Sequence, residues 1–110
     1  MLAKKYRLPV HKIFKIRGRT SGNNYFSVKI TGNTLGFNRF GAVIGAKVSK
    51  KAVVRNKLRR LIFNTVRQNY KNMESPSGLD VLIIMKPAAV NLSEQEIKNL
   101  IIGALQRYVQ

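Results

Sequence analysis

Positive charge is spread unevenly along this 110-residue chain, and the imbalance limits how the chain can fold. The sequence holds 21 Lys and Arg residues against 4 Asp and Glu residues, and no acid comes before Glu74. Residues 1–73 therefore carry 18 of the 21 cations and no carboxylate to pair with them. Self-repulsion of this kind destabilises a compact chain unless an outside polyanion neutralises it. The distribution indicates a nucleic-acid partner, with an anionic membrane surface as the alternative.

Length, cysteine content and hydropathy exclude several classes of protein. A chain of this length suits one domain with a modest core, so we expect a single domain over residues 1–110. The absence of cysteine excludes a disulfide partner and a thiolate metal site, and it agrees with a reducing compartment, so we expect a cytoplasmic protein. No apolar run approaches the roughly 20 residues that span a bilayer. MLAKKYRLPV also lacks the apolar stretch of a secretory signal, and no membrane partner is expected.

Hydrophobic periodicity and turn residues predict an α+β fold with the element order αββαβα. The predicted elements are a short helix from Pro9 to about Gly18, strands over Tyr25 to Thr31 and Gly41 to Val48, a helix from about Lys50 to Tyr70, a strand over Val81 to Met85 and a closing helix. Ser93 and Glu96 form a capping-box pattern that starts the closing helix. VLIIM, the last strand, is apolar throughout, as expected for an interior strand covered on both faces. This order predicts a two-layer sandwich with a small sheet.

The predicted long helix contains the stretch KKAVVRNKLRRLIFNTVRQN, which has seven cations and no acid. At 3.6 residues per turn, one stripe must be buried. This stripe consists of Val54, Leu58, Leu61, Ile62, Thr65 and Val66. The opposite side carries Asn56, Arg59, Arg60, Phe63 and Arg67. A solvated helix usually interleaves acids at four-residue spacing, so this face is expected to bind an anion from outside. Phe63 either stacks on a base or packs beneath a neighbouring element, and the sequence leaves both interpretations open.

No set of residues in the sequence is suited to cutting a phosphodiester. Protein side chains that catalyse this hydrolysis usually include carboxylates that hold one or two metal ions. The four acids have simpler interpretations, because Glu94 and Glu96 begin a helix while Glu74 and Asp80 lie beside a turn. His11 is the only histidine, and GAVIGAK lacks the spacing of a phosphate-binding P-loop. We therefore assign no catalytic and no metal-binding residue.

The stretch AKVSKKAVVRNKLRRLI closely resembles the arginine-asparagine signature helix of the bacterial ribonuclease P protein component. RLPVHKIFKIRGR is similar to the first helix of that family, and NNYFSVKI is similar to its first strand. GLDVLIIMKPAAVNLSEQEIKNLIIGALQR resembles its last strand, proline turn and closing helix. The resemblance covers essentially the whole chain, and its element order agrees with the order predicted from periodicity.

This resemblance implies the protein subunit of a ribonucleoprotein endoribonuclease that removes the 5′ leader of precursor tRNA. Its partners would be the catalytic RNA, which uses Mg²⁺, and the precursor tRNA. The residues implied to bind the catalytic RNA are Lys47, Lys50, Lys51, Arg55, Asn56, Lys57, Arg59, Arg60 and Arg67. The residues implied to bind the leader, in a cleft between the first helix and the exposed sheet face, are Phe14, Arg17, Tyr25 and Lys29. Phe26 shares a stripe with Val28 and Ile30, so we expect it in the core instead.

The resemblance also implies a ribosomal-protein-like fold whose small mixed sheet contains a left-handed βαβ crossover. Parallel units of this kind are right-handed in about 98% of cases, but the resemblance covers both strands and the helix between them, so we expect the left-handed form. Three other functions remain to be compared. A ribosomal protein would share the size and charge. A DNA-binding module would need a short helix before its recognition helix, and a protein nuclease would need more carboxylates.

Overall fold

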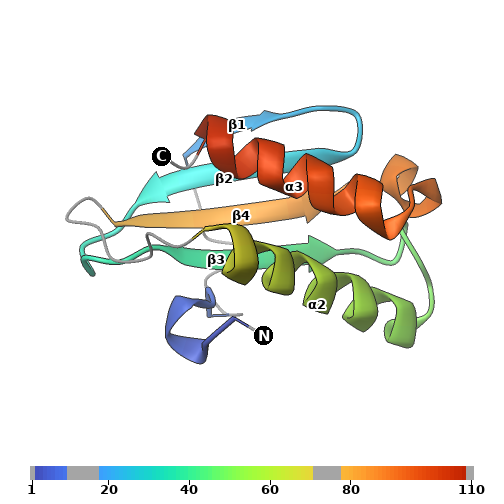
Figure 1. Cartoon of the computed structure of the whole chain (residues 1–110), viewed down its shortest axis with the longest axis horizontal. Helices are drawn as coiled ribbons and strands as arrows, with labels where there is room; N and C mark the ends of the chain where they lie inside the picture. Colours follow the sequence, from blue (N-terminus) through green and yellow to red (C-terminus); the bar gives the residue numbers. More distant parts are fainter. Residues whose placement is uncertain (1, 10–17, 71–77, 109–110) are drawn as a thin grey trace.

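The computed structural model describes residues 2–9, 18–70 and 78–108, which form a four-stranded sheet covered on one face by two helices (Figure 1). The elements are η1 (Lys4–Tyr6), β1 (Arg19–Gly22), β2 (Phe26–Gly32), β3 (Arg39–Ile44), α2 (Ala52–Asn69), β4 (Leu79–Met85), η2 (Pro87–Asn91) and α3 (Glu94–Tyr108). Most of the predicted first helix lies outside the described residues. The α+β fold and the mixed sheet are confirmed, and no helix of the described part is long and apolar enough to cross a membrane.

The sheet has the order β1-β2-β4-β3, which places the apolar strand β4 in the interior as predicted. β2 pairs antiparallel with both β1 and β4, while β3 pairs parallel with β4. β1 was not predicted, because RTSG has no apolar alternation, and it forms an edge strand by pairing with β2. β3 ends at Ile44 and not at Val48, because the chain turns over residues 46–48 before α2 begins.

The connection from β3 through α2 to β4 is left-handed, as the resemblance implied. Figure 1 views the sheet from the face that the helices cover. In this view β3 and β4 run in the same direction, α2 returns in front of the sheet, and β4 lies above β3. The rotation is therefore opposite to that of the usual parallel unit. This topology places α2 over β3, with α3 beside it over β2 and β4.

The main core lies between the sheet and the two helices. The strands contribute alternate residues to it, including Phe26, Val28 and Phe40, so the prediction that Phe26 is a core residue is confirmed. At the start of α3, the Glu96 N–H donates to Ser93 Oγ and the Ser93 N–H donates to Glu96 Oε1, both at 3.1 Å, which confirms the capping box. Ile97, Ile101 and Leu105 of α3 are buried, and their spacing of four residues places them on one face of the helix.

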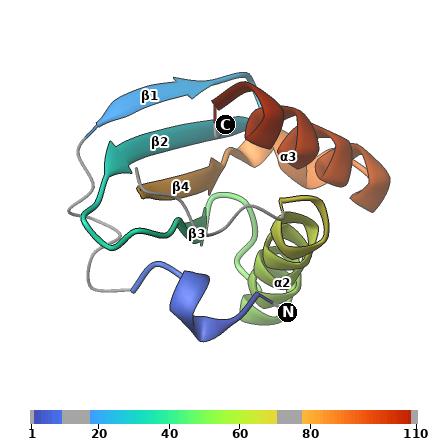
Figure 2. The same ribbon diagram turned by 60° about the vertical axis from the view of Figure 1, so that its left-hand side comes forward.

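Phe63 packs in the core, where only 6% of it is exposed, so its placement on the exposed face of α2 was wrong. The same cluster contains Leu2 and Tyr6 of the N-terminal segment, which runs beside α2 on the side away from α3 (Figure 2). α2 is therefore covered by more than the sheet and α3, and its buried surface is wider than one stripe. Base stacking by Phe63 is excluded, because the ring is not accessible.

The N-terminal segment also extends the sheet beyond β3. Arg7 bridges to Phe40 in parallel, and the Leu8 N–H donates to the Phe40 carbonyl at 2.7 Å. Leu8 consequently lies on the face away from the helices, where it forms a second small cluster with Leu82. The ring of Tyr6 packs edge-on against Phe37, with the centroids 5.8 Å apart. This contact joins the N-terminal segment to the β2–β3 loop, to which Phe37 belongs.

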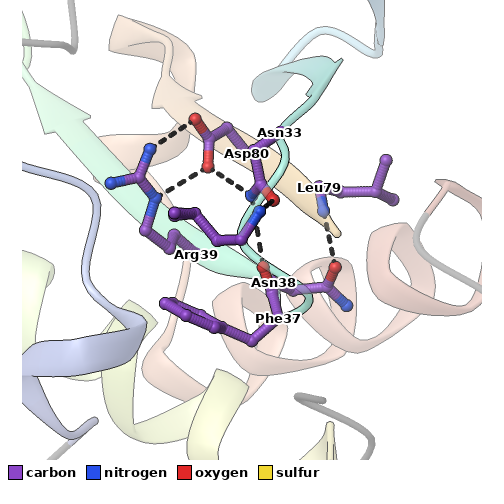
Figure 3. A network of polar contacts seen from close by, with 7 residues as sticks. Asn33, Phe37, Asn38, Arg39, Leu79 and Asp80 are labelled. Atoms are coloured by element: carbon purple, nitrogen blue, oxygen red, sulfur yellow. Dashed lines mark hydrogen bonds and ion pairs between the residues drawn. The ribbon is translucent and has the colours of Figure 1, made fainter. Parts of the chain in front are cut away.

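A buried polar network fastens the β2–β3 loop to the start of β4 (Figure 3). Arg39 Nε and Nη2 donate to the two carboxylate oxygens of Asp80 at 2.9 and 2.7 Å, and Asn33 Nδ2 donates to Asp80 Oδ1 at 2.9 Å. Asn38 accepts from the Leu79 N–H and donates to the Tyr70 hydroxyl, which lies just after α2. Hydrogen bonding to Asp80 raises the pKa of the Arg39 guanidinium, and burial raises the pKa of the Tyr70 hydroxyl. Asp80 is the second residue of β4, whereas the sequence analysis placed it beside a turn.

Candidate nucleic-acid interface

The outward side of α2 presents a cationic surface that no described acid neutralises along most of its length. Lys47, Lys50, Lys51, Asn56, Lys57, Arg60 and Arg67 are exposed, while Arg55 and Arg59 are half-buried. All nine residues that were predicted to bind the catalytic RNA therefore lie in the turn before α2 or on α2 itself. We call this set the α2 surface. One described ion pair reaches it, from Lys57 Nζ to Glu94 Oε1 at 3.6 Å.

Two contacts orient the half-buried arginines of the α2 surface. Arg55 Nη1 donates to the Ser49 carbonyl at 2.9 Å, which closes the turn between β3 and α2. Arg59 Nη1 donates to Asn56 Oδ1 at 2.7 Å, so these two side chains lie next to each other on the outside of the helix. Neither guanidinium uses all five of its donors in these contacts. Both can therefore hold a phosphate while their positions are fixed by the protein.

Val53 is an apolar residue within the α2 surface that the sequence reasoning did not single out. It is 77% exposed, whereas Val54 beside it, which was predicted to be buried, is half-buried. It precedes Asn56 and Arg60 by three and seven residues, so all three lie on the same side of the helix. An exposed valine among cations offers an apolar contact to a ribose or a base. The residue type gives no sign that Val53 is exposed. Its helical spacing from Asn56 and Arg60 could have predicted this.

The residues predicted to bind the leader are only partly described. Phe14 and Arg17 lie outside the described residues, and so does His11. Lys29 is half-buried in the middle of β2, paired with Leu82 of β4 and Thr20 of β1. Leu82 belongs to the cluster on the face away from the helices, so Lys29 lies on that face too. Tyr25 lies just before β2 begins, and its half-buried side chain packs against the main core.

A hollow of about 340 Å³ lies between the α2 surface and the face that carries Lys29. Val43 and Ile84 form its wall on the sheet, and residues 45–48 and Pro87 form its rim. Lys47 lines it from the turn before α2, and Lys86 lines it from the end of β4. An apolar hollow with two lysines at its edge suits a nucleotide better than a metal ion.

The described carboxylates are engaged in structural contacts. Asp80 is buried with Arg39 and Asn33, Glu94 pairs with Lys57, and Glu96 caps α3. The fourth acid, Glu74, lies outside the described residues. Across residues 2–9, 18–70 and 78–108, no three His, Cys, Asp or Glu side chains are grouped so that they could hold a metal ion. The described acids therefore do not fit a Mg²⁺ site.

Comparison with known proteins gives one consistent result. A family model described as Ribonuclease P matches residues 2–109. The ribonuclease P protein component of Clostridium kluyveri is 30% identical over 105 residues, which cover 93% of each chain. That of Clostridioides difficile is 31% identical over 94 residues, covering 82% of this chain and 80% of the relative. The solved structure of the Thermotoga maritima RNase P protein has a TM-score of 0.77 and 27% identity, covering 94% of this chain and 98% of the other.

Proposed function

This chain belongs to the ribonuclease P protein family, and we propose that it is the subunit that binds the catalytic RNA and the 5′ leader of precursor tRNA. In this proposal the catalytic RNA cuts the leader with Mg²⁺, and the protein supplies cations and a surface for both RNAs. The product is the mature 5′ end of the tRNA. The family match favours this function over a ribosomal protein, which composition alone had left open.

The cationic α2 surface is the main support for this proposal. Five of its cations project from α2, a helix whose buried side packs on β3 and α3, so the protein fixes their spacing along the helix before RNA arrives; these are Arg55, Lys57, Arg59, Arg60 and Arg67. Phosphate contacts of this kind provide affinity and orientation without reading sequence. The engagement of Asp80, Glu94 and Glu96 supports the assignment of the chemistry to the RNA, since metal-assisted cleavage by the protein would need free carboxylates.

Arg60→Ala and Arg67→Ala should each weaken binding to the catalytic RNA. Both side chains are exposed, so the free energy of unfolding should change by no more than about 0.5 kcal/mol. The slope of log K against log salt should fall by about one unit for each phosphate contact that is lost. Filter binding over a salt series measures both quantities. Gln68→Ala, an exposed and uncharged position on the same helix, is the matched control and should bind like the wild type. An unchanged salt slope in both arginine variants would contradict the proposal.

Lys29→Ala tests the leader surface separately. Lys29 lies on the sheet face opposite to the helices, so its removal should weaken holoenzyme binding to precursor tRNA and leave binding to mature tRNA unchanged. The reason is that only the precursor has a leader to place on that face. Lys98→Ala, which removes a half-buried lysine from α3 in the helix layer, should not discriminate between the two forms. Equal losses for precursor and mature tRNA in Lys29→Ala would show that Lys29 does not contact the leader.

A further inference from the structure

A second hollow, of about 230 Å³, lies between the β1–β2 turn and α3. It is lined by Asn23, Asn99, Leu100, Gly103, Ala104 and Arg107. α3 passes across the sheet towards the β1 edge, whereas α2 covers β3 at the other edge (Figure 1). We call this site the α3 hollow. It is separate from the α2 surface and from the sheet face that carries Lys29.

The polar groups of the α3 hollow are available as donors. Asn23 Oδ1 accepts from the N–H groups of Tyr25 and Phe26, at 2.8 and 3.0 Å, and its amide nitrogen has two further hydrogens that it can donate to a ligand. Asn99 Oδ1 accepts from Gln95 Nε2 at 3.0 Å, and the Asn99 amide nitrogen likewise has two hydrogens that it can donate. Arg107 is exposed and adds a guanidinium. Two amide groups and one cation that can donate suit an anionic ligand rich in acceptors.

A further cation lies close to the α3 hollow. Lys86 Nζ donates to the Asn23 carbonyl oxygen at 2.6 Å, on the turn that forms one wall. None of the residues lining the hollow is an acid, and the two acids of α3, Glu94 and Glu96, lie at the opposite end of the helix from Arg107. The local charge is therefore positive, which favours an anion electrostatically.

The floor of the α3 hollow is apolar and is kept open by a glycine. Leu100 and Ala104 line it, and a Cβ built on Gly103 would meet nothing within 4 Å. Glycine inside a helix is unfavourable relative to alanine, so α3 is less stable with Gly103 than it would be with a side chain at that position. The open space over Gly103 gives room for a sugar ring beside the donor groups.

We propose that the α3 hollow binds one backbone phosphodiester of RNA, with the attached ribose on Leu100, Gly103 and Ala104. The donors of Asn23, Asn99 and Arg107 hold the phosphate oxygens. This inference rests on the proposed function in one respect, since the anion is taken to be RNA. It adds a third RNA contact, on the β1 edge of the sheet, to the α2 surface and the leader face.

Two substitutions test this site without disturbing the core. Arg107→Ala removes the exposed cation, and Gly103→Glu places a carboxylate in the open space. Each should weaken RNA binding by the full-length chain by about tenfold or more. Arg107→Ala loses a charge-assisted contact, whereas the carboxylate of Gly103→Glu repels the phosphate and fills the space of the ribose. Arg107→Ala should also lower the salt slope by about one unit. Gly103→Ala should raise the thermal midpoint of unfolding, because it adds only a methyl group where nothing lies within 4 Å, so Gly103 is not needed for folding.

Two RNA probes identify the source of the phosphodiester. The first is the catalytic RNA bound by the free protein, and the second is precursor tRNA bound by the assembled holoenzyme. A loss in either arm supports the site and names the RNA that occupies it. Lys98→Ala removes one cation from the same helix outside the hollow and is the matched control. If Arg107→Ala and Gly103→Glu bind both probes like Lys98→Ala while Arg60→Ala binds more weakly than the wild type, the α3 hollow is not an RNA site and the proposed function stands. If Arg60→Ala and Arg67→Ala both bind like the wild type, the proposed function itself fails.

Discussion

Asp80→Ala should lower the free energy of unfolding by about 3–5 kcal/mol, because it leaves the buried Arg39 guanidinium without its counter-charge. The side chains of Arg39 and Asp80 are only 11% and 10% exposed, and two hydrogen bonds join them. The substitution also removes the acceptor of Asn33 Nδ2. A domain of this size has a total stability of about 5–15 kcal/mol, so the variant should be close to unfolding. Urea unfolding in a sulfate-containing buffer, which favours the compact state, measures the loss.

Glu94→Ala is the control for this result, since it breaks an ion pair that is exposed to solvent, whereas the pair of Arg39 and Asp80 is buried. The side chains of Lys57 and Glu94 are 70% and 60% exposed, so the pair should contribute no more than about 1 kcal/mol. A double variant, Arg39→Met with Asp80→Leu, should recover much of the stability lost in Asp80→Ala, because it leaves no buried charge unpaired. Similar losses in Asp80→Ala and Glu94→Ala would contradict the role assigned to the buried network.

Elements with a strong local pattern could be predicted from the sequence. The two long helices, the alternating strand β2 and the apolar strand β4 each lie where periodicity placed them, with ends that differ by a few residues. The capping box at Ser93 and Glu96 was recognisable because both partners lie within four residues of each other. The cationic side of α2 was predictable for the same reason, since helical spacing alone separates it from the buried side.

Features that depend on contacts between distant residues could not be predicted in this way. Arg39 and Asp80 are 41 residues apart, and nothing near either residue indicates the other. β1 is a strand only because β2 lies beside it. Phe63 is buried in a cluster that includes Leu2, far away in the sequence, so a helical wheel drawn for α2 alone placed it wrongly. The left-handed crossover came from the resemblance and not from any physical rule about strands and helices.

We propose that the protein binds and positions the RNAs while the catalytic RNA performs the cleavage. The described carboxylates serve as a buried ion-pair partner, a surface ion-pair partner and a helix cap, and within residues 2–9, 18–70 and 78–108 no three His, Cys, Asp or Glu side chains could together hold a metal ion. In our proposal the cations of α2 lower the repulsion between RNA backbones, which extra Mg²⁺ would otherwise have to screen. We therefore expect the protein to change the Mg²⁺ requirement of the reaction without performing it.

Cleavage of precursor tRNA tests this claim directly, in three parallel reactions at the same low Mg²⁺ concentration. The first contains rigorously RNA-free protein, the second the catalytic RNA, and the third both components. We expect no cleavage by the protein, little by the RNA, and efficient release of the 5′ leader when the two are combined. Raising Mg²⁺ should increase cleavage by the RNA and leave the protein inactive. Mg²⁺-dependent release of the leader by the RNA-free protein would contradict the account.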